Sequence, residues 1–349
     1  MENVQAIIEE TPFSSTWITT RELRTKQVVL EANQHYWDKQ RGPRLDRLVF
    51  RNDLSKQEAL EKCMTTEGEV DIVTELTPVE ASSVQKSPYA KLVTVQGNKM
   101  LIGVFNYFKQ DIHFYDRRIR EAINFAVDRA SIIQNGFGGY ADEVPALTPP
   151  WAFDFPRELT PRQYEPERAR QLLLSANYPK GRTLTVATTK KYENVANIIS
   201  DNLRVTLGIN VHITVILPND ELKWKRVIAE KKLVPAWDIL LTDASALFLE
   251  VTPAFFHREF FGRSGMYRMS PVNDEFETLF NKMTNTIDYE KQVEASKDID
   301  RYVYKEALGL FLCSPRNLYA VNKHVNFKPY RTSLEFAETS VNDSHWSRR

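Results

Sequence analysis

Cysteine and glycine are both scarce in this sequence. The two cysteines, Cys63 and Cys313, lie far apart, which excludes a local metal knuckle. The sequence favours two buried, unreactive thiols, although a disulfide between them stays an open alternative. The 12 glycines are outnumbered by 17 prolines, which argues against long flexible linkers.

Net charge and long apolar runs are missing as well. The 46 basic and 46 acidic residues cancel, so no overall positive field attracts nucleic acid or anionic lipid. No apolar run approaches the ~20 residues that a membrane-spanning helix needs. The first ten residues lack the basic start and long apolar centre of a secretory signal peptide. What is present is an ordinary globular composition with a length of 349 residues, enough for about two domains.

Local catalytic signatures are also absent from the sequence. The six histidines never fall in an H-E-x-x-H pattern, and neither a P-loop nor a G-x-S-x-G turn occurs. Gly136-Phe-Gly-Gly139 follows a predicted helix, which is the wrong context for a dinucleotide site. We therefore expect no enzyme, cofactor or metal site, with a hydrolase whose catalytic residues are dispersed as the least favoured hypothesis.

The stretch from Met100 to Asp128 organises the rest of the chain. The apolar run Met100–Phe105 predicts a buried strand that ends at Asn106. Apolar residues then recur at three- and four-residue steps, which predicts a helix over 117–134 capped by Asp116. We interpret this stretch as a crossing between two lobes that places Asn106 and Tyr107 at the mouth of a cleft. An ordinary strand–loop–helix unit within one domain is the alternative.

Strands and helices alternate along most of the remaining sequence. This alternation predicts an α/β lobe built on a central sheet. The predicted strands cover residues 26–32, 45–51, 70–73, 91–95, 182–187, 211–216, 237–241 and 318–321, and the predicted helices cover 55–65, 78–86, 167–177, 195–207, 220–231, 274–283 and 289–306.

Two further segments suggest ligand binding. The segment with Asp243 and Ser245 follows a predicted strand, where ligands of open α/β sheets tend to bind. A turn supplies Tyr267 and Arg268. Asp243 is suited to a ligand ammonium and Arg268 to a carboxylate, while Tyr107 and Tyr267 would pack on apolar parts of the ligand. For each residue, hydrogen bonding to nearby backbone groups is the competing interpretation.

Several blocks, in order, resemble the family 5 extracellular solute-binding proteins, which are the dipeptide, oligopeptide and nickel receptors of ABC importers. Phe105-Asn106 followed by Ala126-Val-Asp-Arg129 resembles the family's "F-N … A-I-D-R". The other matching blocks are Val29-Leu-Glu-Ala-Asn-Gln-His-Tyr-Trp37, Pro43-Arg-Leu-Asp-Arg-Leu-Val-Phe-Arg51, Gly68-Glu-Val-Asp-Ile72 and Tyr164-Glu-Pro-Glu-Arg-Ala-Arg-Gln-Leu-Leu173. The resemblance spans roughly residues 11 to 330.

The resemblance implies a two-lobed, periplasmic-binding-protein-like α/β fold of type II. Residues 1–104 and 317–349 would form the first lobe and residues 105–316 the second. The implied function is a monomeric binding component of an ABC importer, located in the periplasm or on the outer face of the membrane. It would hold a peptide or similar small solute in the cleft between the lobes and act with permease subunits, without nucleic acid. A ligand-sensing regulatory module with the same fold is the alternative.

The sequence departs from the family pattern at two places. Thr11-Pro12-Phe13 stands where the family has "G-T-G-P-Y/F", so we expect an N-terminally truncated first lobe. Peptide-binding members carry an aspartate in an "A-D-Y-x-x-P" loop, whereas Asp243 is followed by Ala244 and Ser245. The identity of the ligand is therefore not predicted.

Overall fold

The chain folds into two compact units. The computed structural model describes residues 17–19, 27–40, 42–230, 235–245, 254–331 and 336–349. Unit 1 comprises Met1–Val95 and Arg316–Arg349, and unit 2 comprises Gln96–Pro315. The predicted turn at Thr11–Phe13 lies outside the described residues.

The first boundary between the units differs from the one that the sequence suggested. It falls between Val95 and Gln96, before strand β6 (Lys99–Phe105), and not after residue 104. The second boundary falls after Pro315, one residue before the expected position. The physical reason is that β6 belongs wholly to unit 2, where it pairs with a strand on each side. Asn106 and Tyr107 therefore follow the end of β6 that is remote from the crossing.

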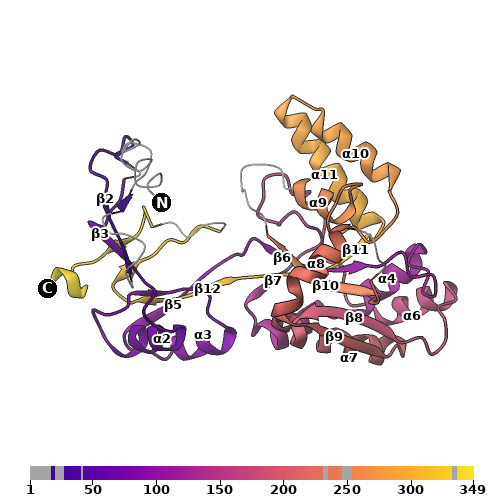
Figure 1. Ribbon diagram of the computed structural model, residues 1–349, viewed down its shortest axis with the longest axis horizontal. Coiled ribbons are helices and arrows are strands. Elements are labelled where there is room, and N and C mark those ends of the chain that lie inside the picture. The colour runs from indigo at the N-terminus through magenta and orange to yellow at the C-terminus, as the bar shows by residue number, and fades with distance from the viewer. Residues whose placement is uncertain (1–16, 20–26, 41, 231–234, 246–253, 332–335) are drawn as a thin grey trace. The chain divides into compact units, whose positions relative to one another are not determined.

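A six-stranded mixed sheet forms the centre of unit 2, in the order β7-β11-β6-β10-β8-β9 (Figure 1). Strands β8, β9 and β10 run parallel to one another, and β6 is antiparallel to both β10 and β11. The strands besides β6 are β7 (Ala141–Glu143), β8 (Leu184–Thr189), β9 (Val211–Ile216), β10 (Ile239–Ser245) and β11 (Gly309–Pro315).

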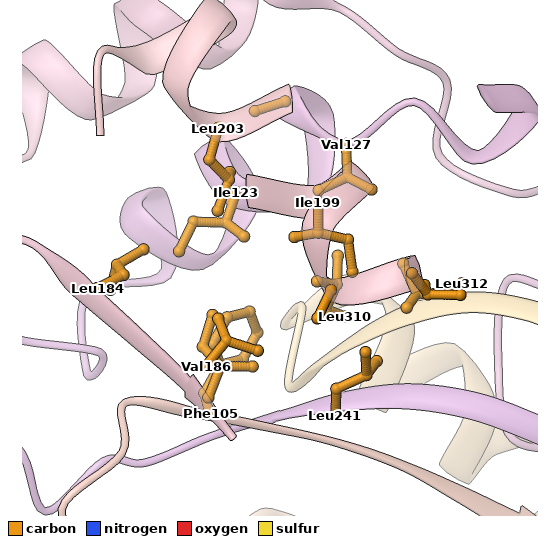
Figure 2. Packing of buried hydrophobic residues seen from close by; sticks show 14 of the residues in the cluster. Phe105, Ile123, Val127, Leu184, Val186, Ile199, Leu203, Leu241, Leu310 and Leu312 are labelled. Atoms are coloured by element: carbon orange, nitrogen blue, oxygen red, sulfur yellow. The ribbon is translucent and has the colours of Figure 1, made fainter. Parts of the chain in front are cut away.

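Helices cover both faces of this sheet because its strands alternate apolar side chains between two cores. Phe105, Leu241 and Leu310 point into the first core with residues of α4, α6 and α7 (Figure 2). Val104, Leu240 and Phe311 point into the second core with α8 to α11. The helices of unit 2 are α4 (Arg117–Ala126), α5 (Arg129–Ser131), α6 (Pro166–Ser175), α7 (Glu193–Leu207), α8 (Glu221–Glu230), α9 (Ala254–Phe261), α10 (Asp274–Thr284) and α11 (Tyr289–Lys305), with the short helical turns η1 (Ile132–Gly136), η2 (Lys190–Tyr192) and η3 (Pro218–Asp220).

The helix predicted over 117–134 is interrupted. Asp116 caps α4 as expected, with its carboxylate accepting from the Arg118 N–H at 2.9 Å. The backbone then becomes extended at Val127 and Asp128. Asp128 caps the next turn by accepting from the Ser131 N–H at 3.1 Å, so a second helix start lies where periodicity alone suggested continuation. By contrast, α7 ends where predicted, because Gly208 adopts the left-handed conformation at φ 67°.

The described residues of unit 1 form smaller sheets and two capped helices. Its sheets have the strand orders β1-β2-β3, β4-β12-β5 and β13-β14. Capping boxes at Ser55 and Thr77 begin the two helices, which correspond to the helices predicted over 55–65 and 78–86. The elements are β1 (Trp17–Thr19), β2 (Gln27–Ala32), β3 (Arg47–Arg51), α2 (Lys56–Thr65), β4 (Ile72–Val73), α3 (Pro78–Val84), β5 (Ala90–Val95), β12 (Asn317–Asn322), β13 (Val325–Asn326), β14 (Ser340–Val341) and η4 (Trp346–Arg348).

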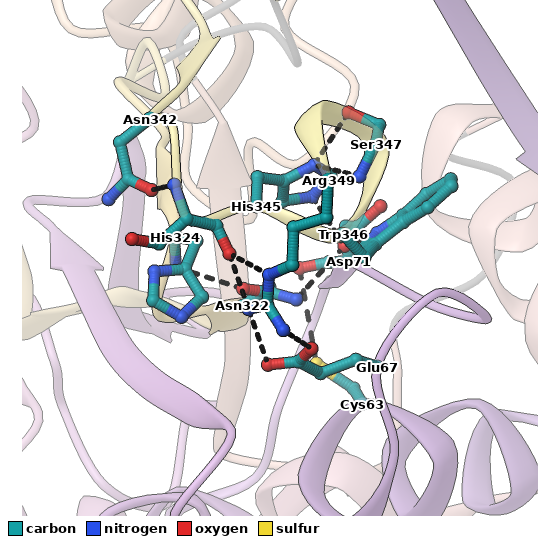
Figure 3. Close-up of polar contacts among 11 residues, drawn as sticks. Cys63, Glu67, Asp71, Asn322, His324, Asn342, His345, Trp346, Ser347 and Arg349 are labelled. Carbon is teal, nitrogen blue, oxygen red and sulfur yellow. Dashed lines mark hydrogen bonds and ion pairs between the residues drawn. The ribbon is translucent and has the colours of Figure 1, made fainter.

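The C-terminal segment is held to unit 1 by Asp71 (Figure 3). One carboxylate oxygen of Asp71 accepts from Asn322 Nδ2 at 3.1 Å and from Trp346 Nε1 at 3.0 Å, and it lies 3.1 Å from His345 Nε2. Arg349 forms an ion pair with Glu67 at 3.1 Å. These contacts order the polar C-terminal segment.

Candidate functional site

One edge of the unit 2 sheet combines both chain crossings with the carboxyl ends of parallel strands. β6 begins there just after Gln96, and β11 ends there at Pro315. Ser245 at the end of β10 pairs with Lys99 at the start of β6, so the carboxyl end of β10 lies at the same edge. We call this the crossing edge. Ligands of open α/β sheets bind beyond the carboxyl ends of the strands.

The two crossing segments contact each other at Gly97. A Cβ added to Gly97 would overlap the Pro315 carbonyl oxygen, so this position requires glycine for close approach. The Gly97 carbonyl accepts from Trp151 Nε1 at 3.1 Å and from Ser314 Oγ at 3.3 Å. The crossings are therefore fixed to unit 2 by packing and by hydrogen bonds.

Asp243 is the central acid of the crossing edge. It lies on β10, and one of its carboxylate oxygens accepts from the Tyr192 hydroxyl and from Lys191 Nζ at 3.2 Å. Burial alone would raise the pKa of Asp243, but the Tyr192 hydrogen bond and the charges of Lys191 and Lys99 outweigh it and lower the pKa. Burial and the neighbouring Asp243 charge raise the pKa of the Tyr192 hydroxyl. Asp243 is thus an ionised acid that already has a cationic partner.

Ser245, the second predicted residue of this group, pairs through its backbone with Lys99. Its side chain, and residues 246–253 after it, lie outside the described part of the structure. Asp243 and Ser245 therefore share the crossing edge.

Asn106 and Tyr107 lie at the opposite end of β6, which we call the far edge. Asn106 is fully buried, and its side-chain amide donates to the carbonyls of Pro235 at 3.1 Å and Trp237 at 2.9 Å. Its side-chain oxygen accepts from the Phe108 N–H at 3.2 Å. The Asn106 side chain thus hydrogen-bonds to backbone groups just beyond the paired residues of β6 and β10. This is the alternative to ligand binding that the sequence left open for this residue.

The Tyr107 ring packs inside unit 2. It contacts the Tyr115 ring edge-on at 5.7 Å, and the Arg120 guanidinium lies 5.2 Å from its centroid. Burial raises the pKa of Tyr107 to about 12. The hydroxyl is buried without a hydrogen-bond partner among the described residues.

Tyr267 and Arg268 belong to the far edge, because the adjacent Met269 carbonyl accepts from the Tyr107 N–H at 2.8 Å. The Tyr267 ring stacks on Phe260 at 5.1 Å. Arg268 donates to the Ser270 carbonyl, and burial lowers its pKa. At ~3.3 Å per residue, the seven residues of β6 separate the two edges by roughly 20 Å. The six predicted residues therefore form two groups and not one cluster.

Sequence reasoning missed Gly97, Trp151, Lys191 and Tyr192 at the crossing edge. A usable signal existed for the last two, since Lys190-Lys191-Tyr192 directly follows strand β8. Ligands of open α/β sheets bind beyond the carboxyl ends of the strands, and this applies to the residues after β8 as well as to Asp243 on β10. No comparable signal marked Gly97 or Trp151, because their contacts depend on the tertiary structure.

Neither a metal centre nor a membrane span is found in the described part of the chain. Its side chains include no group of three or more His, Cys, Asp or Glu that could hold a metal ion. Cys63 and Cys313 are free, buried thiols, and burial raises the pKa of each to about 12. No helix among these residues is both long and apolar enough to cross a membrane.

Comparison with known proteins provides the wider context. The glutathione-binding protein GsiB of Pectobacterium atrosepticum is 23% identical over 314 residues, which cover 86% of this chain and 58% of that protein. The chain thus spans less than two thirds of the length of this relative. NikA from Brucella suis, in complex with Fe(III)-EDTA, superposes with a TM-score of 0.76 at 16% identity, covering 94% of this chain and 68% of NikA.

DppA from Helicobacter pylori, in complex with the peptide STSA, superposes with a TM-score of 0.69 at 19% identity and covers 98% of this chain and 67% of DppA. These structures confirm the predicted fold class. Residues 18–249, most of the chain, match the family described as "Bacterial extracellular solute-binding proteins, family 5 Middle". The chain therefore belongs to the family 5 bacterial extracellular solute-binding proteins.

Proposed function

We propose that this chain provides the solute-binding function of an ABC importer and performs no catalysis. Family membership supports the general function. The observation that carries the proposal is the crossing edge, where the carboxyl ends of β8 and β10 meet both crossings and the ionised Asp243. The described residues of this edge offer a carboxylate and an ammonium as binding groups.

The proposed ligand is a small polar solute such as a short peptide. GsiB is named for glutathione and DppA was solved with a peptide, while NikA was solved with a metal chelate. Asp243 and Lys191 offer one carboxylate and one half-exposed ammonium about a hydrogen bond apart. An amine and a carboxylate on one ligand, as in a peptide, would match this pair in charge.

The two groups of predicted residues have different proposed roles. Asp243 and Ser245 at the crossing edge are the ligand-binding candidates, and Lys191 joins them. Asn106, Tyr107, Tyr267 and Arg268 pack and hydrogen-bond at the far edge, so their part in ligand binding stays a prediction. A ligand position between the two lobes likewise stays a prediction.

We also propose that the protein works as a monomer in the periplasm or on the outer face of the membrane, with permease subunits as partners and without nucleic acid. The balance of 46 basic and 46 acidic residues supports the last point, because nucleic-acid binding depends on an excess of positive charge.

Thermal-shift screening tests the proposed function. Glutathione, di- and tripeptides, haem and nickel chelates would each be added at up to 100 times a trial Kd, where binding stabilises the native state by about 2.7 kcal/mol. We expect at least one class to raise the melting temperature. If none does, and calorimetry with the same panel shows no heat of binding, solute binding by this chain is contradicted.

Variants at the two edges locate the binding site. Lys191→Gln and Asp243→Asn should weaken binding of a responding ligand at least about tenfold, which corresponds to losing one charged contact worth ~1.4 kcal/mol. Arg268→Gln serves as a charge-removing control at the far edge and should leave affinity unchanged. Loss of affinity in the control alone would place the site at the far edge instead.

A further inference from the structure

Three segments of unit 2 meet at a buried cluster of ionisable side chains. Asp154, His257 and Asp300 are each fully buried. His257 lies on α9, Asp300 lies on α11, and Asp154 belongs to residues 144–161, a proline-rich segment that we call the strap. His257 Nε2 lies 2.6 Å from Asp300 Oδ1, and Ser296 Oγ of α11 donates to Asp154 Oδ2 at 3.2 Å.

The cluster carries more acid than base. Two carboxyl groups and one imidazole are electrically neutral when they hold two titratable protons between them, and at least one of these protons then lies on a carboxyl group. Burial strongly disfavours uncompensated charge, so the folded protein favours this proton-rich state. Asp154 Oδ1 and Asp300 Oδ2 are buried without hydrogen-bond partners among the described residues, and a proton on Asp154 would turn one of its acceptors into a donor.

Neighbouring charges pair with other groups and do not neutralise the cluster. On α11, Arg301 pairs with Glu158 of the strap, Glu294 and Asp298. Asp298 also pairs with Lys282 of α10, and Lys297 pairs with Glu294. Three further charged groups on these elements act locally: Glu259 accepts from the Met266 N–H, Glu277 accepts from the Arg263 N–H, and Arg157 donates to the Pro150 carbonyl.

The strap connects this cluster to the first crossing. Trp151, three positions before Asp154, donates its indole N–H to the Gly97 carbonyl at 3.1 Å. Trp151 and Asp154 therefore fix the strap at two points, one at the crossing and one at α11. A change in charge at the second point acts on the segment that holds the first.

We propose that Asp154, His257 and Asp300 form a proton-linked lock, which holds the strap against α9 and α11 while the cluster retains its proton and loosens it when the proton is lost. The lock acts within unit 2 and requires no bound solute. It makes the anchoring of the first crossing dependent on pH.

The direction of the pH dependence follows from Asp154. Burial, reinforced by the Asp300 charge, raises the pKa of Asp154 to about 6, although the Ser296 hydrogen bond and His257 oppose the shift. The unfolded chain has the ordinary aspartate value near 4. Between these two values the folded state binds more protons, so stability falls as pH rises from about 4 through about 6.

Hydrogen exchange on the full chain at pH 5 and pH 7.5 tests the lock. After correction for intrinsic exchange rates, peptides from residues 144–161 should be at least about tenfold better protected at pH 5 in the wild type. Asp154→Asn should remove this difference, since an amide does not titrate. Asp298→Asn, a control substitution at an ion pair on α11, should retain the difference in protection between the two pH values. Equal protection at both pH values in the wild type, or an unchanged difference in Asp154→Asn, overturns the proposal.

A second measurement does not depend on the folding of any variant. Infrared spectra of the wild type should show at pH 5 a protonated-carboxyl band at the higher frequency of a buried carboxyl group, resolved from the band of exposed carboxyl groups, and this band should be lost by pH 7.5. Absence of this band at pH 5 would show that the cluster holds no carboxyl proton, and the lock would be refuted.

Discussion

Arg129 offers the sharpest test of how unit 2 is held together. Its guanidinium is buried, and it donates to the carbonyls of Phe311 at 2.8 Å, Asn124 at 3.0 Å and Arg162 at 3.0 Å. It also donates to the Asn124 side-chain oxygen at 3.0 Å. One side chain thus joins α4, β11 and the segment before α6. Burial lowers the pKa of Arg129 to about 10, although the charge of Glu143 opposes the shift.

Arg129→Met keeps much of the side-chain length and removes every donor. Each buried acceptor left unsatisfied costs ~1–3 kcal/mol, while the apolar replacement recovers part of this by avoiding desolvation of a charge. We expect a net loss of about 3–5 kcal/mol, comparable to breaking a buried ion pair from one side. Such a loss is a large fraction of the ~5–15 kcal/mol that stabilises a typical domain.

The assay is urea unfolding followed by circular dichroism and tryptophan fluorescence. Two units can unfold separately, so the transition of unit 2 must be identified, for example by hydrogen exchange of β6 peptides. Arg204→Met is the matched control, because Arg204 is exposed and, among the described residues, forms an ion pair with Asp201 three positions earlier. It should shift stability by no more than ~0.5 kcal/mol. If Arg129→Met costs less than about 1 kcal/mol more than the control, the bonding network does not stabilise the unit as argued.

Three further predictions concern the crossing edge and the thiols. Gly97→Ala should lower the free energy of unfolding by about 1–3 kcal/mol, because the added methyl group overlaps the Pro315 carbonyl oxygen. Gly42→Ala is the control and should be nearly neutral, because a Cβ there has ordinary contacts. Equal melting temperatures for the two variants would contradict the close approach at Gly97. Asp243→Asn should destabilise the protein at pH 7, and the stability difference from the wild type should shrink as pH falls below about 4. The lowered pKa of Asp243 stabilises the native state only where its carboxyl group is ionised. Thermal melts in which this difference does not vary with pH would contradict the prediction. With a pKa of about 12, Cys63 and Cys313 should each be ~0.01% thiolate at pH 8. A thiol reagent should therefore label neither cysteine in the native protein and both in urea. Rapid labelling of the native protein would refute their burial.

The sequence predicted the fold where local signals were strong. Alternating strands and helices, the cap at Asp116 and the helix end at residue 207 each rest on residues close in sequence, and the structure confirms them. Strand β11 was not among the predicted strands, since a short apolar run has no periodicity of its own. The break at Val127 was missed because the apolar repeat continues across it.

The candidate site was harder to predict because it depends on strand order. β6 and β10 are adjacent in the sheet but far apart in sequence, and they run in opposite directions, so Asn106 and Asp243 lie at opposite edges. Only the tertiary structure shows this. Similarly, the pairing of Asp243 with Lys191 requires β8 beside β10, an arrangement that no local motif records.

Ligand titration of Lys191→Gln beside Arg268→Gln tests the central claim most directly. Calorimetry with the solute that gives the largest thermal shift should show at least about tenfold weaker binding for the crossing-edge variant and unchanged binding for the far-edge variant. Unchanged affinity in Lys191→Gln, combined with a loss in Arg268→Gln, would contradict solute binding at the crossing edge.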